Sequence, residues 1–184
     1  MIRKRIIEKR VLKDFRKRNV QYGQNITING KVLLSDRLNL TLGDSVKINS
    51  GYINPVGHEI ATSFYTVGDA QIVIGNHVGI SNATFYAREG IYIEDYVLIG
   101  GGCRIYDTDF HALEYSKRIE GSEDSISSKQ IRIARGAFIG AHTIILKGVH
   151  IGAQSIIGAG AVVTKSVPEG EIWAGNPARF IRKI

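Results

Sequence analysis

The chain has 184 residues and a formal net charge of +7, from 24 Lys and Arg residues against 17 Asp and Glu residues. An apolar share of 43% is enough for a packed core and excludes wholesale disorder, and the single cysteine, Cys103, excludes an internal disulfide framework. No apolar run approaches the roughly 18 residues of a membrane-spanning helix, and the charged N-terminus is followed by no apolar segment of the kind found in secretory signals, so we expect neither.

The first 21 residues carry the whole net charge, because they hold nine basic and two acidic side chains. Apolar residues recur there at helical spacing and predict a basic amphipathic helix; they are Ile2, Ile6, Ile7, Val11, Leu12 and Phe15. One interpretation is a helix that caps the folded body. The other is peripheral contact of residues 1–21 with an anionic membrane surface. Nucleic acid is not an expected partner, since no aromatic residues interleave the charges.

A six-residue repeat begins after residue 130. Aliphatic residues stand six positions apart without a slip, and they are Ile133, Ile139, Ile145, Ile151, Ile157 and Val163. A helix cannot hold this period, because 3.6 residues per turn would rotate these positions around its axis. Six residues suit a short strand plus a sharp corner, and three such units close a triangular coil of roughly eighteen residues, as in a parallel β-helix. Less regular copies between residues 42 and 105 extend the same fold.

The repeat divides the chain into three predicted parts, namely a helix over residues 1–21, a β-helix over 22–168 and a C-terminal tail over 169–184. Two stretches lose the pattern, near 50–66 and 106–130, and insertions into a solenoid form loops on a face that often binds ligands. His111 lies at the mouth of the second stretch. His58, in the first, is a weaker candidate for lining a site. Cys103 occupies an inward repeat position and is expected in the core.

Four segments resemble the hexapeptide-repeat acyltransferase superfamily, and in particular maltose and galactoside O-acetyltransferases and bacterial surface-polysaccharide O-acetyltransferases. They are IGNHVGISN, IGGGCRIYDTDFHAL, IGAHTIILKGVHIGAQSIIGAGAVVTKSVP and WAGNPARFIRKI, and the resemblance covers about residues 67–182. The resemblance implies a mainly β fold, a left-handed parallel β-helix, with acetyl-coenzyme A as co-substrate and a homotrimeric assembly. It also implies a role in polysaccharide biosynthesis in the cytoplasm, at the inner membrane surface if the helix binds lipid.

The resemblance also implies site residues. His111 matches the catalytic histidine, Asn82 matches an asparagine that contacts the acceptor, and Phe138 stands where sugar acetyltransferases often have tryptophan. The positions that match coenzyme A contacts are Ala141, Ala159, Thr164, Lys165, Arg179 and Arg182. Each has a plainer interpretation: a surface-loop histidine, an asparagine at a tight corner, and ordinary surface charges. No metal is expected, because His142 and His150 are too far apart in sequence for the close pair of the zinc enzymes with this fold.

Acetyl transfer from a thioester to an alcohol needs a base with a pKa near neutrality, which histidine supplies. We therefore expect His111 to take the hydroxyl proton, and either Asp107 or Asp109 to orient its ring, unless both aspartates only shape the turn. The predicted function is O-acetylation of a sugar or glycan precursor. Alternatives are N-acetylation of an amino sugar, O-acetylation of an antibiotic, and a non-catalytic β-helix scaffold.

Overall fold

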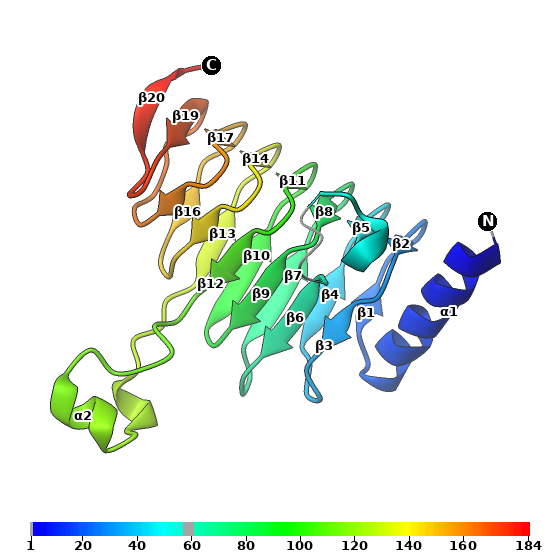
Figure 1. Cartoon of the computed structure of the whole chain (residues 1–184), viewed down its shortest axis with the longest axis horizontal. Coiled ribbons are helices and arrows are strands. Elements are labelled where there is room, and N and C mark those ends of the chain that lie inside the picture. Colours follow the sequence, from blue (N-terminus) through cyan, green and yellow to red (C-terminus); the bar gives the residue numbers. More distant parts are fainter. Residues whose placement is uncertain (1, 57–60) are drawn as a thin grey trace.

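The structure is a computed structural model that describes residues 2–56 and 61–184, with the side chains of residues 2–5 and 53 outside the description. His58 and the Ile2 side chain therefore lie outside the described residues. The chain forms one N-terminal helix, α1 (Ile2–Lys17), followed by short strands that wind into a three-sided parallel β-helix (Figure 1). The predicted mainly β class and the predicted helix are both confirmed.

The β-helix has three sheets, one on each side of the coil. Sheet A contains, in spatial order, β1 (Gln21–Tyr22), β4 (Leu40–Leu42), β7 (Gln71–Ile74), β10 (Gly90–Ile93), β13 (Ile131–Ile133) and β16 (His150–Ile151). Sheet C contains β3 (Leu33–Leu34), β6 (Ser63–Thr66), β9 (Thr84–Ala87), β12 (Arg104–Tyr106), β15 (Ile144–Ile145) and β18 (Val162–Val163).

Sheet B completes the triangle and also holds the C-terminal residues. Its parallel strands are β2 (Thr27–Asn29), β5 (Lys47–Asn49), β8 (Gly79–Ser81), β11 (Leu98–Ile99), β14 (Phe138–Ile139), β17 (Ile156–Ile157) and β19 (Glu171–Ala174). The last strand, β20 (Arg179–Lys183), pairs antiparallel with β19. The predicted tail over 169–184 is therefore a hairpin that extends sheet B, because β19 adds one more parallel rung beside β17.

The core consists of columns in which each inward side chain packs on its equivalent one coil away. In sheet B the register aligns Ile48 with Ile80, Ile80 with Ile99 and Ile99 with Ile139, and all four are buried. Sheet C carries two phenylalanines in its column, Phe64 and Phe85, whose rings stack with centroids 4.9 Å apart. Each of the three sides of a regular coil buries an equivalent inward residue, so these residues recur every six positions along the chain and stack every eighteen.

The N-terminal helix covers the first coil. Val11 and Phe15 are buried in the same core cluster as the strands, and Ile7 and Leu12 pack against it. The apolar stripe of α1 is thus turned towards the protein, as the capping interpretation predicted. Its exposed face carries Lys9, Arg10, Lys13, Arg16 and Lys17.

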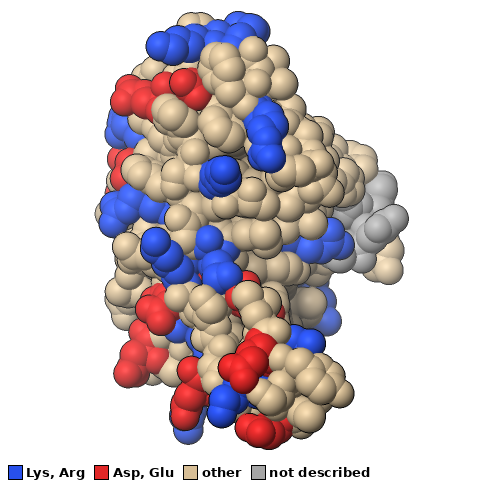
Figure 2. All heavy atoms as spheres, turned by 90° about the vertical axis from the view of Figure 1, so that its left-hand side faces the viewer, with Lys and Arg blue, Asp and Glu red and all other residues tan. Residues whose placement is uncertain are grey.

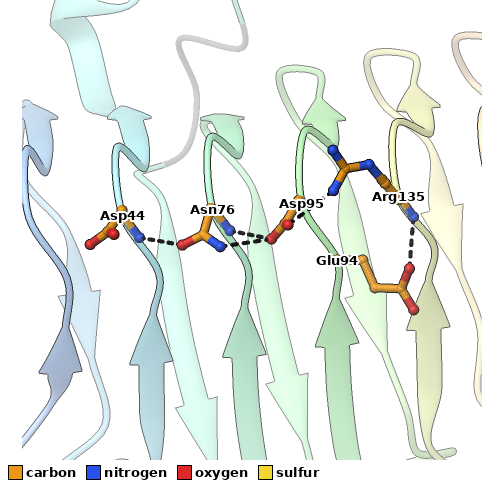
Figure 3. A network of polar contacts seen from close by, with 5 residues as sticks. All are labelled: Asp44, Asn76, Glu94, Asp95 and Arg135. Atoms are coloured by element: carbon orange, nitrogen blue, oxygen red, sulfur yellow. Dashed lines mark hydrogen bonds and ion pairs between the residues drawn. The ribbon is translucent and has the colours of Figure 1, made fainter.

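The corners between sheets A and B are joined by a ladder of polar contacts (Figure 3). The Asp44 amide donates to Asn76 Oδ1 at 2.8 Å, and the Asn76 amide donates to Asp95 Oδ1 at 2.7 Å. Arg135 continues the ladder, since its guanidinium donates to Asp95 Oδ2 at 3.1 Å and its amide to Glu94 at 3.0 Å. Each corner thereby satisfies backbone donors of its neighbour, which holds the coils in register.

The position of the second interruption of the repeat was predicted more accurately than that of the first. The second is a loop between β12 and β13 that carries a short helix, α2 (Tyr115–Ile119), and a 3₁₀ turn, η2 (Glu123–Ser125), as its position predicted. The first contains a 3₁₀ turn, η1 (Gly51–Ile53), but ends before residue 63, because residues 63–66 form β6. The repeat pattern misses this strand because Phe64, and not an aliphatic residue, fills its inward position.

Cys103 is fully buried, as predicted, and its burial raises the pKa of the thiol to about 11. At pH 8 almost no thiolate forms, and a thiol reagent cannot reach the sulfur. We expect the native protein to leave an aromatic disulfide reagent unreacted at pH 8 and to release one equivalent of thiol after denaturation in guanidinium. Rapid reaction of the native protein would contradict this placement. The same result would allow coenzyme A thiol to be measured without background from the protein.

Candidate functional site

The loop between β12 and β13 projects from the coil and carries His111 (Figure 1). A cavity of about 350 Å³ lies between this loop and the end of β9. Tyr86 and Arg88 line it from the coil, and Phe110, His111 and Lys117 line it from the loop. The size falls at the lower end of the range for small-molecule sites. The predicted catalytic histidine thus borders a cavity that joins the insertion to the coil.

The surface around the loop carries both signs of charge, as the lower part of Figure 2 shows, where acidic and basic side chains alternate. Several of them are paired, either within the loop or between the loop and the coil. Arg88 lies 3.4 Å from Glu123, and Lys117 lies 3.9 Å from Glu120. Exposed pairs of this kind contribute little to stability. The cavity is lined by Arg88, Lys117 and Arg118 against a single carboxylate, so its lining carries more basic than acidic side chains.

Phe110 sets the backbone conformation directly before His111. Its φ of 64° is in the left-handed region, which is uncommon for a residue with a bulky side chain. Its ring packs against Tyr86 with centroids 4.8 Å apart and meets Tyr106 edge-on at 5.2 Å. This packing stabilises the left-handed backbone conformation of Phe110. The side chain of the next residue, His111, is exposed beside the cavity.

Asp107 is fully buried and holds the adjacent corner. Its carboxylate accepts the backbone N–H groups of Arg88 at 2.7 Å, Glu89 at 2.8 Å and Gly90 at 2.6 Å. Burial raises the pKa of Asp107, and the three amide bonds act in the opposite direction. These contacts correspond to the turn-shaping role that was the alternative to orienting His111.

Asp109 has a different partner, Lys147, whose Nζ lies 2.7 Å from both carboxylate oxygens. Within residues 2–56 and 61–184, no hydrogen bond joins the His111 ring to Asp107 or to Asp109. The predicted ring-orienting contact is therefore not the arrangement that the structure has. The reason is that backbone amides already occupy one carboxylate and an ammonium group occupies the other.

Asn82 is buried at the corner between β8 and β9, with a φ of 40° that agrees with the corner interpretation. Its side chain accepts the Gly51 amide at 2.7 Å and donates to the Val56 carbonyl at 2.9 Å, which ties the first insertion to the coil. His111 leaves the coil at the next corner, between sheets C and A, so one chain does not bring these two residues to the same corner.

Phe138 lies on the outer face of sheet B and is 45% exposed. In the strand register it stands beside Leu98, which is 53% exposed, so the two side chains form an apolar strip. This strip lies on the side of the coil opposite the sheet C–sheet A corner that carries His111. Within one chain, Phe138 therefore does not share the His111 cavity.

The residues predicted to contact coenzyme A occupy two corners and the terminal hairpin. Ala141 and Ala159 follow β14 and β17 at the corner between sheets B and C, whereas Thr164 and Lys165 follow β18 at the same corner as the His111 loop. Arg179 and Arg182 lie on β20. The side chains of Lys165, Arg179 and Arg182 are exposed, so their charges remain available to an anionic ligand.

Packing requires small residues at the corner between sheets B and C. A Cβ atom added to Gly100 would lie 2.6 Å from the Ala141 amide nitrogen, and one added to Gly140 would lie 2.5 Å from that of Ala159. Successive corners there approach one another closely, which explains why glycine follows the inward isoleucine at both positions.

The part of the chain that the structure describes contains neither a metal-binding group nor a membrane-spanning helix. No group of three His, Cys, Asp or Glu side chains is arranged to hold a metal ion in that part. None of its helices has both the length and the apolar character needed to cross a membrane.

Three residues near His111 were not predicted from the sequence, namely Tyr86, Arg88 and Lys147. Tyr86 and Arg88 stand two positions apart at the end of β9, and this alternation places both on the outer face. Lys147 lies in the repeat itself, 36 residues after His111. Only the pairing of β12 with β15 brings its corner beside the loop.

Comparison with known sequences agrees with the repeat. Residues 130–165 match the family described as bacterial transferase hexapeptide (six repeats). A Schizosaccharomyces pombe protein that bears the name of an acetyltransferase is 40% identical over 103 residues, which are 56% of this chain and 48% of that protein. A similarly named Staphylococcus aureus protein (strain COL) is 33% identical over 125 residues, 68% of this chain and 61% of that protein. The chain thus spans about half to three fifths of the length of these relatives.

Solved structures share the fold. A galactoside acetyltransferase in complex with coenzyme A has 27% identity and a TM-score of 0.62, covering 97% of this chain and 71% of that one. A hexapeptide-repeat acetyltransferase of Vibrio cholerae O1 biovar eltor, complexed with acetyl-coenzyme A, has 29% identity and a TM-score of 0.58 over 75% and 70% of the two chains. An N-acyltransferase of Bacillus cereus has a TM-score of 0.72 at 21% identity, covering 94% of this chain and 87% of that one. At this identity the likeness shows only a shared fold. The predicted resemblance and the left-handed parallel β-helix are confirmed.

Proposed function

We propose that this hexapeptide-repeat protein is an acetyl-coenzyme A-dependent acyltransferase that acetylates a hydroxyl group of a sugar or glycan precursor, with His111 as general base. The observation that carries the proposal is the position of His111, on the loop that interrupts the repeat and at the edge of a cavity that the loop forms with the coil. The names of the sequence relatives and the coenzyme A bound to two solved neighbours support the donor.

The chemistry follows from the residues at the cavity. A neutral imidazole at His111 takes the proton of the acceptor hydroxyl as its oxygen attacks the thioester carbonyl. The new carbon–oxygen bond forms, the carbon–sulfur bond breaks, and the proton passes from the imidazolium to the departing thiolate. The rings of Tyr86 and Phe110 in the cavity wall offer the flat apolar surface on which a sugar ring can stack.

The coenzyme is held, in this proposal, between copies of the chain in a homotrimer. The matching residues support this arrangement, since Ala141 and Ala159 lie at one corner of the coil, whereas Thr164 and Lys165 lie at another. A second copy would set one corner beside the other. Lys165, Arg179 and Arg182 provide exposed cations for the phosphate groups.

An acceptor panel with thiol release as readout tests the function. The panel contains neutral sugars, amino sugars and hydroxyl-bearing antibiotics, each incubated with acetyl-coenzyme A and the protein. Transfer to sugar hydroxyls is the expected result. Transfer only to amines would support the N-acetyltransferase alternative, and transfer only to an antibiotic would support the detoxifying one. Absence of both acetyl-coenzyme A binding and transfer would support a non-catalytic scaffold.

The exposed face of α1 supports a place for the enzyme at the inner, anionic surface of a membrane, where glycan precursors for polysaccharide biosynthesis are lipid-linked. The apolar stripe is buried against the coil, so the attraction in this proposal is electrostatic, worth about 1 kcal/mol per Lys near the surface. Deleting residues 1–21 would expose the core and is not a clean test.

We expect the triple substitution K9E, K13E and K17E to abolish sedimentation with vesicles that contain anionic lipid, while the melting temperature stays close to that of the parent protein. The matched control reverses the exposed Lys31, Arg37 and Lys47, which lie outside α1. Equal sedimentation of the α1 variant and the control would contradict a role for the helix.

A further inference from the structure

The ion pair between Asp109 and Lys147 is the shortest one in the part of the chain that the structure describes. Lys147 Nζ contacts both oxygens of Asp109 at 2.7 Å, and the two side chains are 27% and 21% exposed. The remaining pairs there have separations from 3.1 to 3.9 Å. Partial burial and contact with both oxygens distinguish this pair from an ordinary surface bridge.

The two partners come from different levels of the fold. Lys147 follows β15, and its corner is fixed to the coil because β15 pairs with both β12 and β18. Asp109 belongs to the projecting loop, where its amide donates to the Ser127 carbonyl at 3.0 Å. The ion pair therefore connects a rigid corner to the loop that carries His111.

The connection reaches His111 through a single residue. Phe110, between Asp109 and His111, has a left-handed φ, a conformation that costs on the order of 1 kcal/mol and persists only where its surroundings hold it. The Asp109–Lys147 pair holds the chain on one side of Phe110, and the Tyr86 and Tyr106 rings hold the Phe110 side chain. Release of Asp109 would allow the backbone at Phe110 to relax and would move the His111 ring.

We propose that Lys147 is a positioning residue for His111, acting through the carboxylate of Asp109. This inference rests on the proposed function of His111. It assigns Asp109 a part in catalysis that is indirect, since its carboxylate sets the position of the loop and does not contact the imidazole. A displacement of about 1 Å at a catalytic group can cost about a hundredfold in rate, so a pair that fixes the loop has a measurable effect.

The test is a double-mutant cycle in the full chain. K147M removes the charge and keeps the length of the side chain, and we expect it to lower kcat at least about tenfold while the KM for acetyl-coenzyme A changes less than about twofold. K147R, which keeps the charge, should restore most of kcat. In an H111A background, K147M should lower the remaining rate by less than about twofold, because the group that it positions is gone.

The matched control is R135M, which removes the Arg135–Asp95 pair at another corner and should leave kcat unchanged. D109N removes the other charge of the pair and is expected to lower kcat as K147M does. It serves as the test variant if K147M fails to fold. An equal loss of kcat from K147M with and without His111, or an unchanged kcat in both K147M and D109N, would overturn the inference. If H111A itself keeps full activity, the proposed general base is wrong, and this failure is distinguishable because it appears before Lys147 is changed.

Discussion

Replacement of His111 by alanine is expected to lower kcat/KM for acetyl transfer by about 10²- to 10⁴-fold, the usual contribution of a positioned general base. The fold should not change, because the His111 side chain is exposed and has no hydrogen-bond partner among the described residues. The measurement is the rate of coenzyme A thiol release over a range of acceptor concentrations, which gives kcat/KM, together with a thermal melt. Binding of acetyl-coenzyme A should persist, since His111 is not among the residues that match coenzyme A contacts.

The control is H150A. His150 is also an exposed histidine, but it lies on β16 in sheet A, outside the projecting loop. Its replacement should leave the rate within about twofold of the parent. A rate for H111A that matches H150A would reject His111 as the base and would favour a scaffold or a different catalytic group.

Replacement of Phe85 by alanine is expected to destabilise the fold by about 3–5 kcal/mol, the typical cost of removing a buried phenylalanine. Phe85 is fully buried and stacks on Phe64 at 4.9 Å within the column of sheet C. The cavity would open in the middle of the coil, where the neighbouring strands are paired on both sides and cannot collapse into it. Chemical denaturation monitored by circular dichroism measures the change in the free energy of unfolding.

The matched control is L98A, since Leu98 is apolar but points outward from sheet B and is 53% exposed. In the isolated chain its loss should cost less than about 1 kcal/mol. A similar loss of stability for L98A and F85A would mean that the outer apolar strip is as buried as the core in solution, as a stable contact between copies would produce.

The regular part of the coil was predictable because its signal is local and repeated. Each inward Ile of the last array meets the same environment, so the period of six appears directly in the sequence. β6 escaped prediction for the same physical reason, since Phe64 fills the column as well as an aliphatic residue does but does not match the pattern. The hairpin formed by the C-terminal tail was not predicted either, because pairing of β19 with β17 depends on a partner more than a dozen residues away.

The candidate site was predictable only in part. His111 could be singled out because it matches the catalytic histidine of the family that the chain resembles and stands where the repeat breaks. Asn82 was correctly expected at a corner as one of two interpretations. The partners of Asp107 and Asp109 could not be deduced, because the Arg88–Gly90 amides and Lys147 are brought to the carboxylates by coil stacking. A carboxylate near a histidine in sequence takes whichever donors the fold places within reach.

The amino-acid order alone determined the class of fold, the burial of Cys103 and the position of the projecting loop, since each depends on a periodicity or on its interruption. Only the tertiary structure decided which corner carries each candidate residue, that α1 turns its apolar stripe inward, and that Lys147 pairs with Asp109. The difference is one of distance along the chain: neighbours within a coil follow from spacing, whereas neighbours between coils follow from how many residues each loop inserts.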